Sequence, residues 1–195
     1  MDVKTYVFFG NVGAGKGTQI ELLQKHLNEK DGREVAYAYP GAEFRKLING
    51  TDYTSLLVKE LLNAGKLVPM FLVSWVIGNV LVEKVKSPDT HIIFDGFPRS
   101  LDQVIAFESM IELYKRTNIE LVYIEVPKEE VINRMKLRGR FDDTDEGIAQ
   151  RFSEYENNVI PALNLLKEKG YPVHTINGAQ KVEEVFADLK KSLSI

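Results

Sequence analysis

The 195-residue sequence has no cysteine, only three histidines and a single tryptophan. Without cysteine, disulfide bonds, thiolate metal ligands and a cysteine nucleophile are all excluded. The histidines, His26, His91 and His174, lie far apart in the sequence. We therefore expect each of them to be a surface or packed residue and not part of a metal site.

The sequence also lacks a strong net charge and an apolar run of membrane-spanning length. Its 25 basic and 28 acidic residues give a net charge of −3, which argues against a protein that coats nucleic acid. The apolar segment 70–82 is too short to span a bilayer, and the first residues lead directly into a predicted strand and leave no room for a signal peptide. We expect one cytoplasmic domain with no nucleic-acid or membrane partner.

Glycine, in contrast, is concentrated in the run GNVGAGKGT over residues 10–18. This run follows an apolar strand-like segment and opens an amphipathic one, which is the context in which backbone N–H groups and a helix N-terminus hold a polyphosphate. Lys16 is placed to reach the outer phosphates, and Thr18 to face Mg²⁺, although Gly17 occupies the usual hydroxyl position. The alternative is a glycine-rich turn with a solvated lysine.

Apolar runs alternate with amphipathic segments along the rest of the chain. The pattern predicts strands at 4–9, 34–39, 91–94, 121–126 and 173–176, and helices at 15–29, 42–48, 53–64, 69–87, 101–115, 128–137, 144–169 and 181–193. Such alternation is typical of a three-layer α/β/α fold with a five-stranded parallel sheet covered on both faces.

Several local features refine the predicted helices. The helix at 53–64 should carry one apolar face. The segment Met70–Val82 is apolar on nearly every side, so it is either central to the core or covered by another subunit of a homo-oligomer. Ser100 and Gln103 have the spacing of a capping box. The helix at 144–169 should be capped by Thr144 and bent where Pro161 removes a backbone donor. The apolar face at 53–64 comprises Tyr53, Leu56, Leu57, Leu61 and Leu62.

Polar residues follow several of the predicted strands. In an open parallel sheet the carboxyl ends of the strands meet at one edge, so Gly10, the Pro40-Gly41 turn and Asp95 should converge on one cleft. Asp95 directly follows the strand at 91–94, where a carboxylate can hold magnesium through its water shell. The alternative is that Asp95 caps a helix or a turn.

Arginines form a second signal, since four of them fall between positions 134 and 151. Guanidinium groups match the charge that spreads over the oxygens of a transferring phosphoryl group. Asp142 and Asp143 can hold these arginines in place, and Arg45 and Arg99 could grip a second phosphate. The alternative is a solvated charged face. The four arginines are Arg134, Arg138, Arg140 and Arg151.

Four collinear motifs resemble those of adenylate kinase and its nucleoside monophosphate (NMP) kinase relatives. They are residues 10–19, Gly65-Lys66-Leu67-Val68-Pro69, Asp95-Gly96-Phe97-Pro98-Arg99, and Arg140-Phe141-Asp142-Asp143 with Arg151. The resemblance implies reversible phosphoryl transfer from MgATP to a nucleoside monophosphate, with AMP as the first candidate. It also implies a P-loop core at 1–36, 88–137 and 145–195, a small helical NMP-binding insertion at about 37–69, and a very short lid at about 138–144, with Mg²⁺ but no zinc.

The resemblance also assigns roles to individual residues. Those implied in catalysis are Lys16, Arg99, Arg138, Arg140 and Arg151. Those implied in ATP binding are Gly13, Ala14, Gly15, Lys16, Gly17, Thr18, Arg134, Arg138 and Ala179. Those implied in binding the monophosphate are Arg45, Val68, Gly96, Arg99, Gln103, Arg140 and Arg151. Magnesium would be held through Thr18 and Asp95, by way of water.

Departures from the family pattern leave alternatives open. Pro40 stands where the family usually has a threonine that touches the acceptor base, so we expect relaxed base specificity. A UMP/CMP or thymidylate kinase is one alternative, and Tyr39-Pro40-Gly41 is similar to the thymidylate enzymes, which lack the Asp-Gly-Phe-Pro-Arg motif. An NTP-hydrolysing switch or nucleotide sensor is an alternative of a different class.

Overall fold

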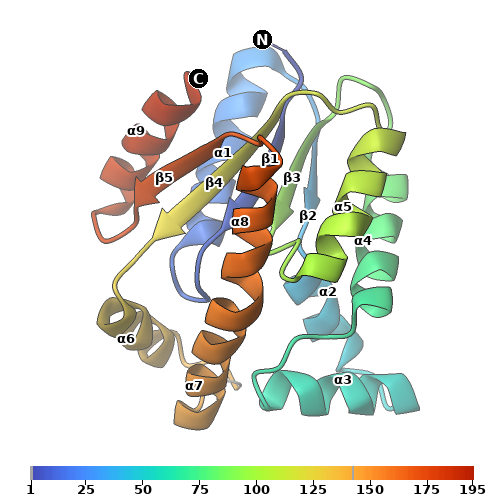
Figure 1. The fold of residues 1–195 in the computed structure, drawn as a ribbon, viewed down its shortest axis with the longest axis vertical. Helices are drawn as coiled ribbons and strands as arrows, with labels where there is room; N and C mark the ends of the chain where they lie inside the picture. The colour runs from blue at the N-terminus through green and yellow to red at the C-terminus, as the bar shows by residue number, and fades with distance from the viewer. Residues whose placement is uncertain (1, 142) are drawn as a thin grey trace.

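The computed structural model describes residues 2–141 and 143–195. Its centre is a five-stranded sheet with the order β2-β3-β1-β4-β5, in which every neighbouring pair is parallel (Figure 1). The predicted parallel sheet is therefore confirmed. The strands are β1 (Thr5–Phe9), β2 (Val35–Ala38), β3 (His91–Asp95), β4 (Ile119–Glu125) and β5 (Val173–Asn177).

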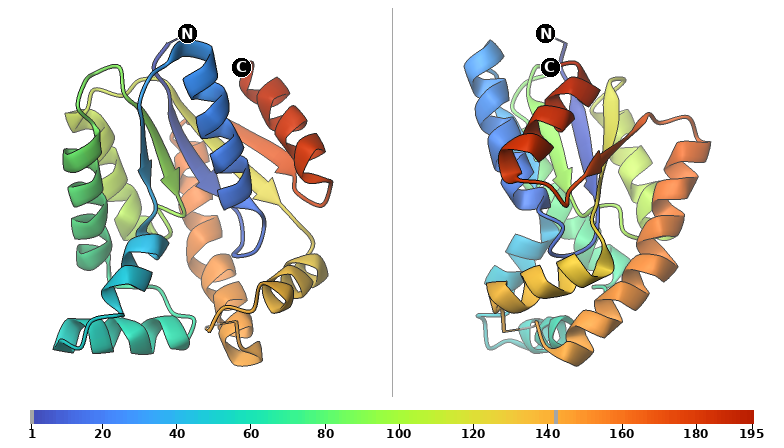
Figure 2. Two further views of the ribbon diagram at one scale, coloured as in Figure 1. Left: turned by 180° about the vertical axis from the view of Figure 1, so that it is seen from behind. Right: turned by 90° about the vertical axis from the view of Figure 1, so that its left-hand side faces the viewer.

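Helices cover both faces of the sheet. α1 and α9 lie on one face and α4, α5 and α8 on the other, while α2, α3, α6 and α7 gather beyond the carboxyl ends of the strands (Figures 1 and 2). The bounds are α1 (Lys16–Asp31), α2 (Pro40–Leu47), α3 (Tyr53–Asn63), α4 (Met70–Lys84), α5 (Leu101–Leu113), α6 (Lys128–Arg138), α7 (Asp145–Glu154), α8 (Ile160–Glu168) and α9 (Val182–Leu193).

The pleat of the central strand divides the core into two layers. Tyr6 and Phe8 of β1 pack with the α1 and α9 side, whereas Val7 and Phe9 pack with the α4, α5 and α8 side. All four side chains are at most 2 % exposed. A strand buried on both faces explains why this segment is apolar without alternation.

The predicted helix at 144–169 is present, with a change of register inside it. Thr144 accepts a hydrogen bond from Gly147 N at 3.0 Å, as expected of its cap. A π-helical turn, Tyr155–Val159, then separates α7 from α8, and the Ile160 N–H donates to the Tyr155 carbonyl. The turn lies immediately before Pro161, so the missing proline donor is absorbed by a change in hydrogen-bond register.

One predicted local feature, the capping box at Ser100, is wrong, and the predicted apolar face of α3 is present but not buried. The apolar face of α3 is largely exposed, with Tyr53 at 76 % and Leu56 at 50 %, because α3 lies beyond the end of the sheet and packs chiefly on α2. The capping box at Ser100 is not formed either. The Ser100 hydroxyl donates to Asp102, and Gln103 Oε1 accepts instead from Arg99 N at 2.9 Å.

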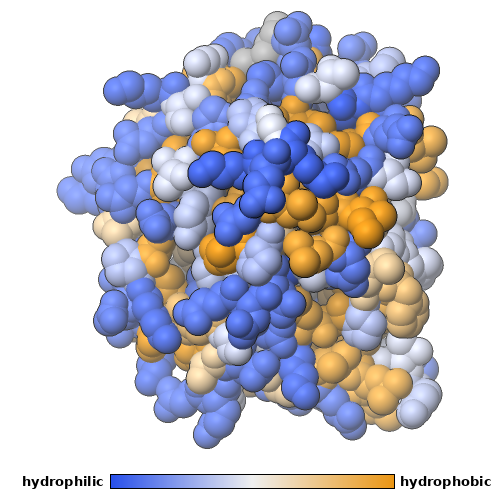
Figure 3. Space-filling model, in the orientation of Figure 1, coloured by the Kyte–Doolittle hydropathy of each residue, from blue (hydrophilic) through white to orange (hydrophobic). Residues whose placement is uncertain are grey.

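α4 is buried on one side only, so it is not the fully enclosed helix that one alternative described. Its inner face packs on β2, α5 and α2, while Phe71, Trp75 and Val82 are 58–73 % exposed. In Figure 3, apolar residues gather on the right-hand side, over the region that α3, α4 and α5 occupy in Figure 1. Among the described residues, none of the helices combines the length and apolar character needed to cross a membrane.

Candidate functional site

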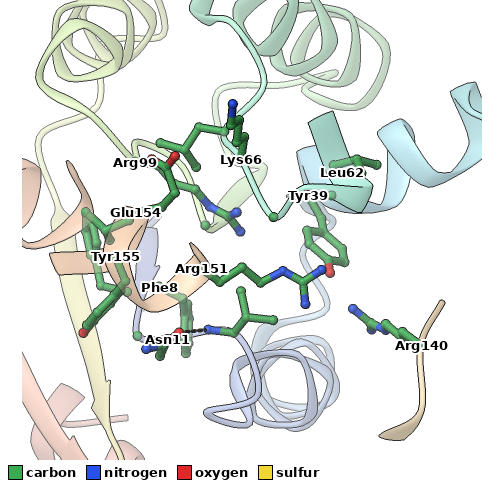
Figure 4. Close-up of a pocket in the computed structure, with 18 of the residues that line it drawn as sticks. Phe8, Asn11, Tyr39, Leu62, Lys66, Arg99, Arg140, Arg151, Glu154 and Tyr155 are labelled. Carbon is green, nitrogen blue, oxygen red and sulfur yellow. Dashed lines mark hydrogen bonds between the residues drawn. The ribbon is translucent and has the colours of Figure 1, made fainter. Parts of the chain in front are cut away.

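A cleft opens beyond the carboxyl ends of the strands, between the segment that carries α2 and α3 and the helices α6 and α7. Its lining includes the glycine loop, the end of β3 and cationic side chains from five further segments of the chain. Figure 4 shows the guanidinium groups of Arg99, Arg140 and Arg151 pointing into one space beside the Tyr39 ring. Topology thus brings together arginines that are up to 52 positions apart in the sequence.

The glycine loop has a backbone shape that side chains would not permit. Gly10 has a φ of 140°, and a Cβ atom there would lie 2.6 Å from the Ile124 carbonyl oxygen. Gly15 adopts a left-handed conformation as the N-cap of α1, with a φ of 92° and no side-chain cap. The loop therefore packs against β4 and presents the N-terminus of a 16-residue helix to the cleft.

Lys16 is buried under this loop. Its Nζ donates to the carbonyl oxygens of Gly10 at 2.8 Å and Asn11 at 2.9 Å. Burial lowers the pKa of Lys16 from its ordinary value of 10.5 to about 8; the negative charge of Asp95 opposes this shift and the neighbouring arginines add to it. Such a desolvated ammonium group, held by two carbonyl oxygens, is poised to gain from an incoming polyphosphate.

Asp95 is 4 % exposed and lines the same cavity as the glycine loop, which we call the loop cavity. Its Oδ2 accepts a hydrogen bond from the Tyr37 hydroxyl at 2.9 Å, while its Oδ1 is buried with no partner among the described residues. Thr18 lines the same cavity and is exposed. An unpartnered carboxylate oxygen and a free hydroxyl on one cavity fit a hydrated magnesium ion.

No group of three or more histidine, cysteine, aspartate or glutamate side chains that could hold a metal ion occurs in residues 2–141 and 143–195. Phosphate oxygens and water would have to complete the coordination.

The arginines of α6 and α7 converge on Asp143. Arg138 binds this carboxylate through two hydrogen bonds, at 3.0 and 2.7 Å, and Arg151 through one at 2.7 Å. The Asp143 side chain is 1 % exposed. Burial alone would raise its pKa, but the hydrogen bonds from both arginines outweigh burial and lower it. Asp143 therefore orders the two guanidinium groups, as predicted, while Asp142 lies outside the described residues.

Arg99 and Arg140 are less restrained than Arg138 and Arg151. Among the described residues, no side-chain hydrogen bond or ion pair holds the guanidinium group of Arg99 or of Arg140. Gly96 has a φ of 65°, and a Cβ there would lie 2.2 Å from Arg99 Nη2, so the glycine makes room for the guanidinium. Burial lowers the pKa of Arg99 while Asp95 opposes the shift, and the group stays cationic.

Arg134 lines the same cavity as Arg99, Arg138 and Arg140, and its guanidinium group lies at the turn after β5. Its guanidinium donates to the Gly178 carbonyl at 3.0 Å and to Glu130 Oε1 at 2.9 Å. Arg134 also lines a further cavity beside the cleft, together with Gly13, Ala14, Gly15, Gly178 and Gln180. Ala179 itself is exposed, and its N–H donates to Asn177 Oδ1.

Two of the predicted acceptor residues do not line the cleft with their side chains. Val68 is 7 % exposed and belongs to the hydrophobic core, and the cleft is lined at this point by Lys66 and Leu67. Gln103 is 3 % exposed, with its Oε1 held by the Arg99 N–H. Its Nε2 has no hydrogen-bond partner among the described residues.

Tyr37 and Tyr39 are site residues that the motifs did not single out. Both line the loop cavity, and Tyr39 also lines the neighbouring one, where its hydroxyl accepts from Arg45 Nη2 at 2.8 Å. The sequence does contain a signal for them. Tyr37 and Tyr39 are two positions apart at the end of a strand that leads into the cleft, and residues i and i+2 of a strand share a face.

The cleft consists of two anion-binding halves with cations between them. One half is lined by Val12, Gly13, residues 15–18 and Asp95, and the other by Arg45, Lys66 and Arg151. Three arginines, Arg99, Arg138 and Arg140, line both halves. The arrangement can hold two phosphorylated ligands with their phosphates facing the same guanidinium groups.

Comparisons with known proteins agree with this geometry. Residues 8–171 match a family model described as Adenylate kinase. The chain is 36 % identical over 185 residues to the adenylate kinase of Mycolicibacterium smegmatis, and 35 % identical over 184 residues to that of Mycolicibacterium paratuberculosis; both alignments cover 93 % of this chain and 94 % of the relative. It is 30 % identical over 198 residues to that of Leptospira biflexa serovar Patoc, which covers 98 % of this chain and all of the relative.

Proposed function

Because the chain belongs to the adenylate kinase family, we propose that it catalyses the reversible transfer of a phosphoryl group from MgATP to AMP, giving two ADP. The observation that carries this proposal is the sharing of Arg99, Arg138 and Arg140 between the two halves of the cleft. A transferring phosphoryl group spreads charge over its equatorial oxygens and needs cations on both sides of its path.

On the donor side, residues 13–18 would bind the ATP phosphates, with Lys16 exchanging its two carbonyl partners for phosphate oxygens. Arg134 and the turn at Ala179 would lie near the adenine. Asp95 and Thr18 would hold Mg²⁺ through water, and the ion, when bound, neutralises charge on the donor phosphates.

On the acceptor side, Arg45 and Arg99 would bind the AMP phosphate, with Arg140 and Arg151 closing over it. Gly96 leaves room for the Arg99 guanidinium. Val68 would contact the base through its backbone, because its side chain is in the core. Gln103 would read the adenine through its Nε2.

No covalent intermediate is needed for this reaction. An oxygen of the acceptor phosphate attacks in line, the bond to the leaving ADP breaks, and the residues in catalytic roles, Lys16, Arg99, Arg138, Arg140 and Arg151, stabilise the charge that develops. Water must be excluded because it would compete as the acceptor. Adenylate kinases close over their substrates, and we expect the insertion at about 37–69 and the short lid at about 138–144 of this chain to do the same.

The test is ADP formation from MgATP and a panel of nucleoside monophosphates. We expect AMP to be the best acceptor, and a wild-type protein that forms no ADP from any monophosphate would contradict the proposal. A dinucleotide with five bridging phosphates should bind far more tightly than ATP, because it fills both halves. An NTP-hydrolysing switch would gain nothing from the second nucleotide, so equal affinity for both would favour that class.

We propose separately that the protein is not strict for AMP as the acceptor. Pro40 replaces the usual threonine, and a lost base contact reduces specificity more than phosphate binding. We therefore expect appreciable phosphorylation of CMP, UMP or GMP at saturating concentrations. Use of AMP alone would contradict a relaxed base pocket. The relatives reported above are all named adenylate kinase, which gives no support to a UMP/CMP or thymidylate kinase.

We also propose that the exposed side of α4 mediates a homo-oligomer. Phe71, Trp75 and Val82 form an apolar surface on a helix whose opposite side is already packed on the sheet. A cytoplasmic location and the absence of nucleic-acid and membrane partners remain predictions.

A further inference from the structure

Two tyrosines at the end of β2 connect the two halves of the cleft. The Tyr37 hydroxyl donates to Asp95 Oδ2 at 2.9 Å, and the Tyr39 hydroxyl accepts from Arg45 Nη2 at 2.8 Å. The two rings stack, with centroids 5.9 Å apart and 26° between their planes. A continuous set of contacts therefore runs from the carboxylate of the donor side to a guanidinium group of the acceptor side.

The pairing of β2 with β3 explains the first contact. Tyr37 lies opposite Ile93 in the parallel register, so Asp95 is two residues further along the neighbouring strand, on the same face of the sheet. Tyr39 is two residues beyond Tyr37 and shares that face, which allows the rings to stack. The contacts of Tyr37 with Asp95 and with Tyr39 are thus built into the edge of the sheet, and with Arg45 they form what we call the tyrosine bridge.

The second contact is fixed by the first turns of α2. A Cβ atom at Gly41 would lie 2.7 Å from Tyr39 Cε2, so the ring packs directly on the backbone of this helix. The Arg45 guanidinium lies 5.1 Å from the centroid of the same ring. Tyr39 is therefore enclosed between Tyr37 and α2, with its hydroxyl at the boundary of both cavities.

We propose that Tyr37 and Tyr39 are positioning residues that couple the two substrate sites, so that MgATP on the Asp95 side and AMP on the Arg45 side strengthen each other's binding. This inference rests on the function proposed above. Tyr37 occupies one oxygen of Asp95 and leaves the buried Oδ1 as the free atom for a hydrated cation. A ligand that fixes either end fixes the other through the stacked rings, and such coupling must be reciprocal.

The test uses calorimetry, in the absence of turnover. The Kd of AMP is measured with and without the β,γ-imido analogue of ATP plus Mg²⁺. The coupling is the Kd without the analogue divided by the Kd with it. In the wild type this ratio should exceed one. Tyr37→Phe keeps the ring stack and removes the hydrogen bond to Asp95, so the ratio should fall to about one, and the Mg²⁺ needed for analogue binding should rise about tenfold.

Tyr6→Phe is the matched control. It removes another buried tyrosine hydroxyl of the same sheet, and this hydroxyl has no partner among the described residues. Its coupling ratio and Mg²⁺ dependence should equal those of the wild type. Similar thermal unfolding of Tyr37→Phe and Tyr6→Phe would show that an altered ratio does not come from misfolding.

Tyr39 is tested from the acceptor side. Tyr39→Phe keeps the stack and the cation–π contact but leaves Arg45 without its hydroxyl partner, so KM for AMP should rise about five- to tenfold with little change in kcat. Tyr39→Ala removes the bridge, so it should abolish the coupling as Tyr37→Phe does.

The outcomes separate the two proposals. A wild type that couples the ligands but forms no ADP would overturn the proposed function and leave the bridge standing. An active wild type with a ratio of one, or a Tyr37→Phe variant with unchanged coupling and Mg²⁺ dependence, would overturn the bridge alone.

Discussion

Lys16 and Asp143 show how charged side chains of this protein are held while no nucleotide neutralises them. Lys16 is bound by two backbone carbonyl groups, and Asp143 binds Arg138 and Arg151. A buried charge without a partner would be costly, so the Lys16 ammonium group and the Arg138 and Arg151 guanidinium groups each have an internal acceptor, which a phosphate oxygen can replace.

Loss of the central cations should abolish most of the activity. Lys16→Met and Arg99→Ala should each reduce kcat at least ~100-fold, as is typical when a preorganised charge contact in the transition state is removed. The measurement is the steady-state rate of ADP formation. Lys25→Met is the matched control, because Lys25 is on the same helix with its side chain 74 % exposed. Near-normal rates in both site variants would show that the roles are misassigned.

The pKa of Lys16 predicts how ATP binding depends on pH. In the free protein this pKa is about 8 because of burial, and bound phosphates would raise it. Between the two values, binding must take up a proton, so the affinity for ATP should fall as pH rises above about 8. Calorimetry in buffers of different ionisation enthalpy measures the uptake. Lys16→Arg does not titrate in this range and should show none, whereas equal uptake by both proteins would exclude Lys16 as the source.

Sequence reasoning identified most residues that the cleft brings together, for a local reason. The glycine loop, Asp95 and Arg99 each follow a buried strand, and the ends of parallel strands converge. Tyr37 and Tyr39 were missed because their roles depend on which strand lies beside β2, which local pattern does not reveal. Val68 was assigned to the cleft from its motif, but its side chain packs in the core.

Helix boundaries were largely predictable, since proline, glycine and Thr144 mark them. The burial of α3 was not, because an amphipathic period gives the direction of an apolar face but not the element that covers it. The π-helical turn before Pro161 shows the same limit. Pro161 predicts that the helix is disrupted, but the sequence does not show that the disruption takes the form of a π-helical turn.

The cap of α7 should contribute measurably to stability. Thr144→Ala leaves the Gly147 N–H without its acceptor, which should cost about 1 kcal/mol and lower the Tm by roughly 2–4 °C. Thr144→Ser retains the acceptor oxygen and should restore the Tm nearly to the wild-type value. Differential scanning calorimetry measures both variants, and an equal loss in both would argue against the cap.

The turn between α3 and α4 approaches α7 so closely that only glycine fits. Gly65 has a φ of 68°, and an added Cβ would lie 2.6 Å from the Gly147 carbonyl oxygen. Gly65→Ala should therefore push these elements apart and raise KM for AMP about tenfold, since small displacements of binding groups are costly. Gly32→Ala is the control, with the same φ of 68° and no atom within 4 Å. It should lower stability alone, so an equal change of KM in both would remove the argument.

For the molecule as a whole, the arrangement is a rigid sheet with two segments extending from one edge. The parallel five-stranded architecture followed from the alternation of strands and helices, as did its two-sided cover. Whether the chains associate could not be predicted from the sequence, because an exposed apolar helix face does not specify its partner.

Trp75, the only tryptophan, reports on the proposed oligomer. It is 58 % exposed, so its emission should shift to shorter wavelength as protein concentration rises and α4 becomes covered. Trp75→Glu should shift the mass measured by light scattering toward the monomer. Leu113→Glu, at an apolar position on α5 that is 75 % exposed, should not. A strictly monomeric wild type at micromolar concentration would remove the oligomer.

The near-contact of Gly65 with the first turn of α7 has a further consequence for turnover. Because Gly65 also lines the cleft, we expect the two backbones to separate before ADP departs and this departure to be the slow event of each cycle. Turnover would then depend on solvent viscosity, so kcat should decline as sucrose is added. The equilibrium between bound substrates and bound products should stay unchanged.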